Sequence, residues 1–230
     1  TGWVYVDISG RDLGSFVADA QKAVLEQVEL PGGYALGWSG QYEYMLRAKE
    51  RLTYVVPLTL VIILLLLYFN FRNFTESFMV MFAVPLALVG AFWIICALGY
   101  NLSVAVGVGL IALAGLSAEF GVVMLVYLNQ ALRVYEEKAR NEKRRVTLSE
   151  LRNAVTEGAL LRVRPIMMTV SAIIAGLLPI MLGSGTGSEV MRRIAAPMVG
   201  GMISATLLTL IILPAVFLLW KQIEIKNYKE

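Results

Sequence analysis

Residues 58–69 read LTLVIILLLLYF, an uncharged run inside a longer apolar segment, Leu52–Phe71. A helix needs about 20 predominantly apolar residues to cross a bilayer, and this segment has that length. Four further segments qualify in the same way: Ser77–Leu98, Leu102–Leu128, Pro165–Leu182 and Ile194–Trp220. The sequence therefore predicts a mainly α-helical integral membrane protein with a five-helix transmembrane domain at residues 52–220.

The composition supports a membrane location. Hydrophobic residues make up 58% of the 230 residues and the mean hydropathy is +0.69, which is more apolar than a soluble domain. The net charge of +3 is too small to indicate a nucleic-acid partner, whereas the spans are expected to contact membrane lipid. The chain has no histidine and one cysteine, Cys96, which excludes an internal disulfide and a zinc site of the usual nitrogen–sulfur type. No phosphate-binding loop or nucleophile–base pair is recognisable, so we expect no enzyme activity.

Residues 1–51 have a different pattern from the spans. GWVYVDI, residues 2–8, is rich in β-branched and aromatic residues and predicts a strand. Asp12–Val28 carries apolar residues at helical spacing, and PGGYALGWSG, residues 31–40, predicts a turn and a second strand. We expect a partial βαβ subdomain that completes its sheet with sequence outside this chain. A polar helix at residues 41–51 then runs into the first span.

Lysine and arginine predict the orientation of the spans. Residues 129–164 hold nine of them and the tail, residues 221–230, holds three more. The hairpin between the last two spans holds only Arg192 and Arg193. We therefore expect residues 129–164 and the C-terminal tail in the cytoplasm, and residues 1–51 on the opposite side.

A short helix is predicted inside the basic segment. Thr147 and Glu150 have the spacing of a capping box, and the apolar residues that follow share one helix face. This pattern predicts an amphipathic helix at about residues 147–162, lying on the cytoplasmic face of the helix bundle.

GLSAEFGVV, residues 115–123, places an acid inside the third span. Glu119 is the only charged residue between Glu76 and Arg133. A charge at the centre of a span costs about 2.5–3.5 kcal/mol on insertion scales. Ala112 and Gly115 stand seven and four positions earlier, and small residues on one face let another helix approach closely, so we expect Glu119 to face protein. Burial disfavours the charged form of a carboxyl, so Glu119 can serve a proton relay. The alternative is a protonated glutamate that only hydrogen-bonds a neighbouring helix.

Several long motifs resemble the resistance-nodulation-division pumps. They are LAGLSAEFGVVML (residues 113–125), RVRPIMMTV (162–170) and LLPIMLGSGTGSEVMRRIAAPMVGGM (177–202), supported by GWVYVDISGRD (2–12) and SGQYEYMLRA (39–48). The likeness is greatest to the heavy-metal efflux branch and its copper/silver members. It implies a C-terminal fragment of a proton-driven pump of the bacterial inner membrane, with residues 1–51 belonging to the periplasmic porter. It also implies a homotrimer, a periplasmic adaptor protein, an outer-membrane channel and a missing N-terminal half.

The resemblance implies roles for three residues in a proton relay. Glu119 falls on a position that is lysine in the drug-exporting branch and glutamate in the metal branch. Arg162 and Thr169 fall on relay positions of the drug pumps, although Arg162 can also be an ordinary cytoplasmic anchor. Ile166 stands where the copper/silver pumps have a relay lysine, so either Arg162 takes the cationic role or the relay differs.

The resemblance also places a metal ligand at Met191, which matches one of the paired methionines of the copper/silver pumps. A thioether is a soft ligand suited to Cu(I), but a methionine here can equally be a packing residue. We expect no resident cofactor and a transported ion that is Cu(I) or Ag(I), with zinc, cobalt, nickel and cadmium left open by Ile166. Two other functions stay open: a drug or solute exporter, against which Glu119 argues, and a truncated membrane remnant that does not transport.

Overall fold

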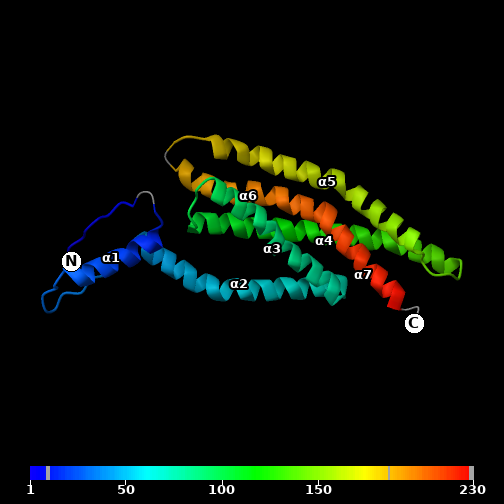
Figure 1. Cartoon of the computed structure of the whole chain (residues 1–230), viewed down its shortest axis with the longest axis horizontal. Helices are drawn as coiled ribbons and strands as arrows, with labels where there is room; N and C mark the ends of the chain where they lie inside the picture. Colours follow the sequence, from blue (N-terminus) through cyan, green and yellow to red (C-terminus); the bar gives the residue numbers. More distant parts are fainter. Residues whose placement is uncertain (9–10, 186, 228–230) are drawn as a thin grey trace. The chain divides into compact units, whose positions relative to one another are not determined.

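The computed structural model describes residues 1–8, 11–185 and 187–227, and every regular element in them is helical (Figure 1). The helices are α1 (Leu13–Gln27), α2 (Gln41–Phe71), α3 (Phe74–Ala97), α4 (Val104–Asn141), α5 (Leu148–Leu182), α6 (Ser188–Leu207), the π-helical segment η1 (Leu208–Ile212) and α7 (Leu213–Asn227). Five stretches of the described chain are long and apolar enough to cross a membrane: α2, α3, α4, α5 and the continuous run from α6 to α7. The prediction of five long apolar helices is confirmed.

The chain divides into two compact units, which are residues 1–62 with 101–104 and residues 63–100 with 105–230. In the first unit, α1 begins after Asp12, whose carboxylate accepts a 2.8 Å hydrogen bond from the backbone N–H of Ser15. Hydrogen bonds from the side chain and the backbone of Ser15 lower the pKa of Asp12. The helix predicted at Asp12–Val28 is therefore present, with a capped start.

The two strands predicted around α1 are not formed. Residues 2–8 and 31–40 adopt no regular structure beyond a turn, so the predicted βαβ subdomain is observed only as its helix. A strand is held by ladder hydrogen bonds to a neighbour, and neither segment finds a pairing partner within the described residues. Local β propensity alone does not supply that partner.

Two helices continue past the ends of the predicted spans. α4 extends from the predicted span at 102–128 to Asn141. α5 joins the amphipathic helix predicted at 147–162 to the span at 165–182 without a break, so the prediction of a separate helix is wrong. Proline is tolerated in packed membrane helices because neighbouring groups satisfy the freed carbonyl, and Pro165 lies inside α5. At about 1.5 Å per residue, α5 is longer than a hydrocarbon core of about 30 Å. The apolar segment at 165–182 forms its second half, so the first turns of α5 lie outside that segment.

α5 begins with the predicted capping box. The side chain of Thr147 accepts from the N–H of Glu150, and the Glu150 carboxylate accepts from the N–H of Thr147 at 2.9 Å. Arg144 donates to both carboxylate oxygens of Glu150, at 2.6 and 2.7 Å. These bonds from Arg144, outside the apolar segment at 165–182, lower the pKa of Glu150 to about 2.

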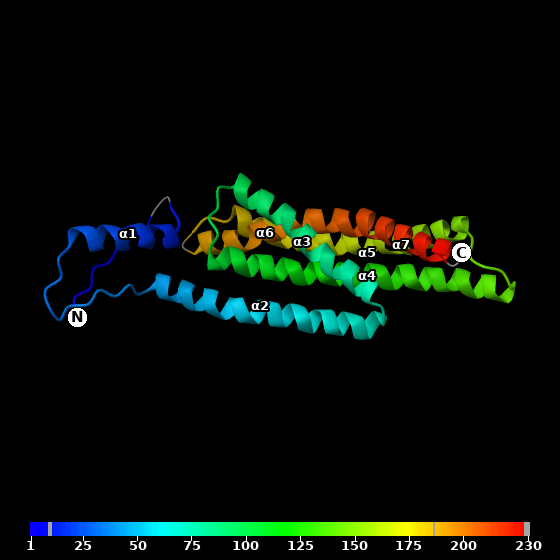
Figure 2. The same cartoon turned by 60° about the horizontal axis from the view of Figure 1, so that its bottom comes forward.

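Within the second unit, α6 packs against α3 and α5 (Figure 2), and glycines allow a close approach where α6 meets α3. A Cβ added at Gly200 would lie 2.6 Å from Cγ2 of Ile94 and 2.7 Å from the carbonyl oxygen of Gly90. In the same crossing, the hydroxyl of Ser204 donates a 2.7 Å hydrogen bond to the carbonyl of Ala87. Small residues and hydrogen bonds of this kind hold membrane helices together where lipid removes the hydrophobic driving force.

α4 supplies the centre of the core in this unit. Its buried side chains include Leu113, Phe120, Met124, Leu125, Leu128 and Leu132. α5 approaches α4 closely at Gly158, where an added Cβ would lie 3.0 Å from Cα of Leu128 and 3.0 Å from the carbonyl oxygen of Tyr127. This crossing sets the register between the two helices that carry Glu119, Arg162 and Thr169.

Candidate functional site

Glu119 lies on a face of α4 that the described helices leave uncovered. Its side chain is exposed, as is Gly115, where an added Cβ would meet nothing within 4 Å. Ala112 on the same face is half-buried, whereas Leu113 and Phe120 on the other faces are buried in the core. The prediction that Glu119 faces protein therefore requires a helix from outside the described residues, and the small residues leave room for one.

Arg162 lies on α5 against a tyrosine of α4. The guanidinium carbon of Arg162 is 4.3 Å from the centroid of the Tyr127 ring, which is a cation–π contact. The Nε atom of Arg162 is buried and has no hydrogen-bond partner among the described residues. The side chain of Arg162 is half-buried, and its guanidinium lies against the Tyr127 ring.

By residue count from the crossing at Gly158, Thr169 and Glu119 are about equally far along their helices, while Arg162 lies nearer the α4–α5 loop. Measured from the crossing at Gly158, and at about 1.5 Å per residue, Thr169 is about 16 Å along α5 and Glu119 is about 14 Å along α4. Arg162 is only about 6 Å from that crossing. No hydrogen bond or ion pair joins the three side chains within the described part of the chain, and the hydroxyl of Thr169 donates instead to the carbonyl of Pro165 at 3.1 Å.

Met191 lies in the first turn of α6, next to the hairpin that follows α5. Its side chain is 57% exposed, so the sulfur is accessible to a ligand from outside the described helices. Arg192 beside it donates to the carbonyl of Gly183, the C-cap of α5. This bond ties the two ends of the hairpin together. No group of three or more His, Cys, Asp or Glu side chains that could hold a metal occurs among the described residues.

The structure shows interhelical contacts of two residues, Glu76 and Tyr127, for which the sequence predicted no role. Glu76 in the first turn of α3 is buried and accepts a 2.7 Å hydrogen bond from the side-chain amide of Asn129. The sequence did contain a signal, since Asn73 and Glu76 have capping-box spacing, but that signal would have turned Glu76 back onto its own helix. Tyr127 has no comparable signal, because an aromatic residue at a helical position reads as packing.

The π-helical segment η1 lies just before Pro214, which lacks an N–H. A π-helical turn is a common local adjustment beside such a break.

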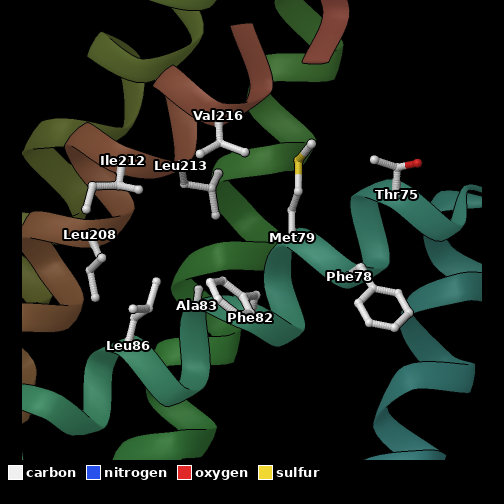
Figure 3. Close-up of a pocket in the computed structure, with 10 residues that line it drawn as sticks. All are labelled: Thr75, Phe78, Met79, Phe82, Ala83, Leu86, Leu208, Ile212, Leu213 and Val216. Atoms are coloured by element: carbon white, nitrogen blue, oxygen red, sulfur yellow. The ribbon is translucent and has the colours of Figure 1, made fainter. Parts of the chain in front are cut away.

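An apolar groove lies between α3 on one side and η1 and α7 on the other, with a volume of about 310 Å³ (Figure 3). The lining side chains are Thr75, Phe78, Met79, Phe82, Ala83, Leu86, Leu208, Ile212, Leu213 and Val216. None of them is titratable, so the groove offers no site for proton transfer.

The chain is similar to known efflux proteins over almost its whole length. A model of the AcrB/AcrD/AcrF family matches residues 3–221. The chain is 51% identical to the cation efflux system protein CusA of Escherichia coli (strain K12), over 96% of this chain and 21% of CusA. It is 36% identical to the cobalt-zinc-cadmium resistance protein CzcA of Cupriavidus metallidurans, over 93% of this chain and 19% of CzcA.

The fold also resembles a solved structure. The crystal structure of a heavy metal efflux pump in its crystal form II matches with a TM-score of 0.73 and 34% identity, over 94% of this chain and 20% of the other. The chain therefore spans about a fifth of the length of the proteins that it matches.

Proposed function

The chain belongs to the AcrB/AcrD/AcrF family of resistance-nodulation-division pumps, and from this premise we propose that it is part of a proton-driven exporter of heavy-metal cations. The five apolar helices form the last five spans of the membrane domain. The transported ion is Cu(I) or Ag(I), and proton entry drives its export. The pump acts as a homotrimer in the bacterial inner membrane, joined to a periplasmic adaptor protein and an outer-membrane channel.

The proposal depends above all on the position of Glu119. It is a lone acid in an apolar helix, on a face that Ala112 and Gly115 keep free for another helix. Intramembrane acids of this kind are costly and mark proton pathways. Binding a proton removes the charge from the membrane interior, so the ionised and protonated states favour different arrangements of the partner helix. Thr169 on α5 is about equally far along its helix from the crossing at Gly158 and can hydrogen-bond a member of that relay.

Met191 supports a soft metal ion as the cargo. Its thioether is accessible at the start of α6, and a thioether binds Cu(I) or Ag(I) without having to lose a proton. One such ligand cannot hold an ion, so a second ligand comes from the rest of the pump. Two weak neutral ligands exchange an ion quickly, as transport requires.

Glu119→Gln in the full-length pump tests this proposal. We expect the substitution to abolish metal tolerance of a pump-deletion strain while the protein level and trimer assembly stay unchanged. Glu136→Gln is the matched control, because Glu136 is an exposed acid on the same helix beyond its apolar segment. Normal tolerance with Glu119→Gln would refute a proton-driven mechanism through Glu119 and leave this residue as a hydrogen-bonding residue only. Growth of the same strain on copper, silver, zinc, cobalt, nickel and cadmium identifies the ion.

A further inference from the structure

The guanidinium of Arg162 stacks on the ring of Tyr127 in this structure. Of the polar atoms of Arg162, Nε is buried without a hydrogen-bond partner, and no ion pair to its guanidinium is formed within the described residues. The polar contact that the structure shows for the guanidinium is therefore the face of the Tyr127 ring, whose centroid is 4.3 Å from Cζ of Arg162. We propose that Tyr127 is a positioning residue that fixes the guanidinium of Arg162 in the direction needed for proton transfer. The proposal rests on the proposed function, because it assumes that the pump moves protons.

The backbone crossing between α4 and α5 explains why the two side chains meet. Gly158 stands one turn before Arg162 on α5, and an added Cβ there would lie 3.0 Å from the carbonyl oxygen of Tyr127. This close approach brings the first atoms of Arg162 alongside α4 at the height of the ring. Gly158 thereby makes the stack possible, and a larger residue at this position should open it.

A guanidinium held by a ring face keeps its hydrogen-bond donors free. Arginine has five N–H donors in a planar fork, and stacking on an aromatic face occupies none of them. Nε is buried, so it is the donors on the two NH2 groups of Arg162 that can serve a carboxylate or a water from another part of the pump. Without the ring, the long side chain can turn toward the membrane surface, as arginines near helix ends do, and the donors are lost to the relay.

Substitutions at Tyr127 in the full-length pump test the role of the ring. The pump is reconstituted in lipid vesicles, and silver-dependent proton movement is followed with a pH indicator over a range of pH. Tyr127→Leu should slow the initial rate by about 2- to 30-fold, the range that a cation–π contact can supply, and should shift the pH of half-maximal rate. Tyr127→Phe keeps the ring face, so its initial rate and its pH of half-maximal rate should equal those of the wild type.

Tyr135→Leu is the matched control. Tyr135 lies two turns further along α4, is half-buried like Tyr127, and its hydroxyl donates to Glu157 of α5 at 3.0 Å. The change removes a different tyrosine-mediated contact between α4 and α5, one made to Glu157 rather than to Arg162, so the pH profile should stay in place. A shift equal to that of Tyr127→Leu would reduce Tyr127 to a packing residue. Should Tyr127→Leu fail to assemble, Tyr127→Met keeps flexible apolar bulk and is judged by the same outcomes, with Gly158→Ala as a second way to open the stack.

Arg162→Gln separates this inference from the proposed function. If Tyr127 acts through Arg162, adding Tyr127→Leu to Arg162→Gln should cause no further loss of rate. A wild-type rate and pH profile for Tyr127→Leu, or an equal loss for Tyr127→Phe, would overturn the inference. Normal transport by Arg162→Gln together with loss in Glu119→Gln would also overturn it, while the proposed function stands. Normal transport by both variants would refute the proposed function itself.

Discussion

The side-chain amide of Asn129 on α4 donates a 2.7 Å hydrogen bond to the carboxylate of Glu76 on α3, across 53 positions of sequence. Glu76 is only 6% exposed, so its carboxylate depends on protein partners rather than water. The bond connects the start of α3 to the central helix of the core. A buried charged group that loses its partner is costly, whereas replacing both partners by apolar groups can be nearly neutral.

Asn129→Leu should therefore destabilise the protein. Leaving the Glu76 carboxylate without this donor should cost about 1–3 kcal/mol or more, seen as a lower midpoint of thermal unfolding in detergent. The double variant Glu76→Leu with Asn129→Leu should recover most of that loss, because no buried polar group is then left unpaired. A double variant that is as unstable as the sum of both single variants would show that the two residues act independently.

Gly200→Ala should loosen the crossing of α3 and α6. The new Cβ would meet Ile94 at 2.6 Å and the carbonyl oxygen of Gly90 at 2.7 Å, and overpacking of this kind costs about 1–3 kcal/mol. The thermal midpoint in detergent measures the effect. Gly176→Ala on α5 is the control, since an added Cβ there has nothing within 4 Å, and its midpoint should not fall. Equal behaviour of the two variants would argue against a tight crossing at Gly200.

Met191→Ile should lower tolerance of copper and silver while leaving zinc tolerance and protein level unchanged. The substitution keeps an apolar side chain of similar bulk and removes the soft sulfur. Met168→Ile is the matched control, because Met168 is also an exposed methionine on a membrane helix. Unchanged copper and silver tolerance with Met191→Ile would identify Met191 as a packing residue.

Cysteine labelling of intact cells tests the predicted orientation. The native thiol, Cys96, is exposed and is first replaced in Cys96→Ser. In that background, Ser184→Cys in the α5–α6 hairpin should react with a membrane-impermeant reagent, and Ser149→Cys at the start of α5 should react only after the cells are opened. Labelling of Ser149→Cys from outside would reverse the topology.

The sequence by itself determined the helices that can cross a membrane and the local starts of two helices. A run such as Leu52–Phe71 is long and apolar whatever its neighbours are, and length and apolarity decide insertion. Asp12 and Thr147 bond to backbone groups only three residues away, so residue type and spacing are sufficient to predict the cap. The same length and apolarity of the segment Leu102–Leu128 place Glu119 inside a span.

Only the tertiary structure decided which side chains meet. Tyr127 with Arg162, and Glu76 with Asn129, lie far apart in sequence and come together because close-packed helices fix their register, as at Gly158. The same dependence on partners explains the failed prediction of strands in residues 1–51 and the unbroken course of α5 through Pro165. A strand exists only with a paired neighbour, and a proline in a span is tolerated when packing satisfies the freed carbonyl. Periodicity and propensity describe one segment at a time, so they contain no information about such partners.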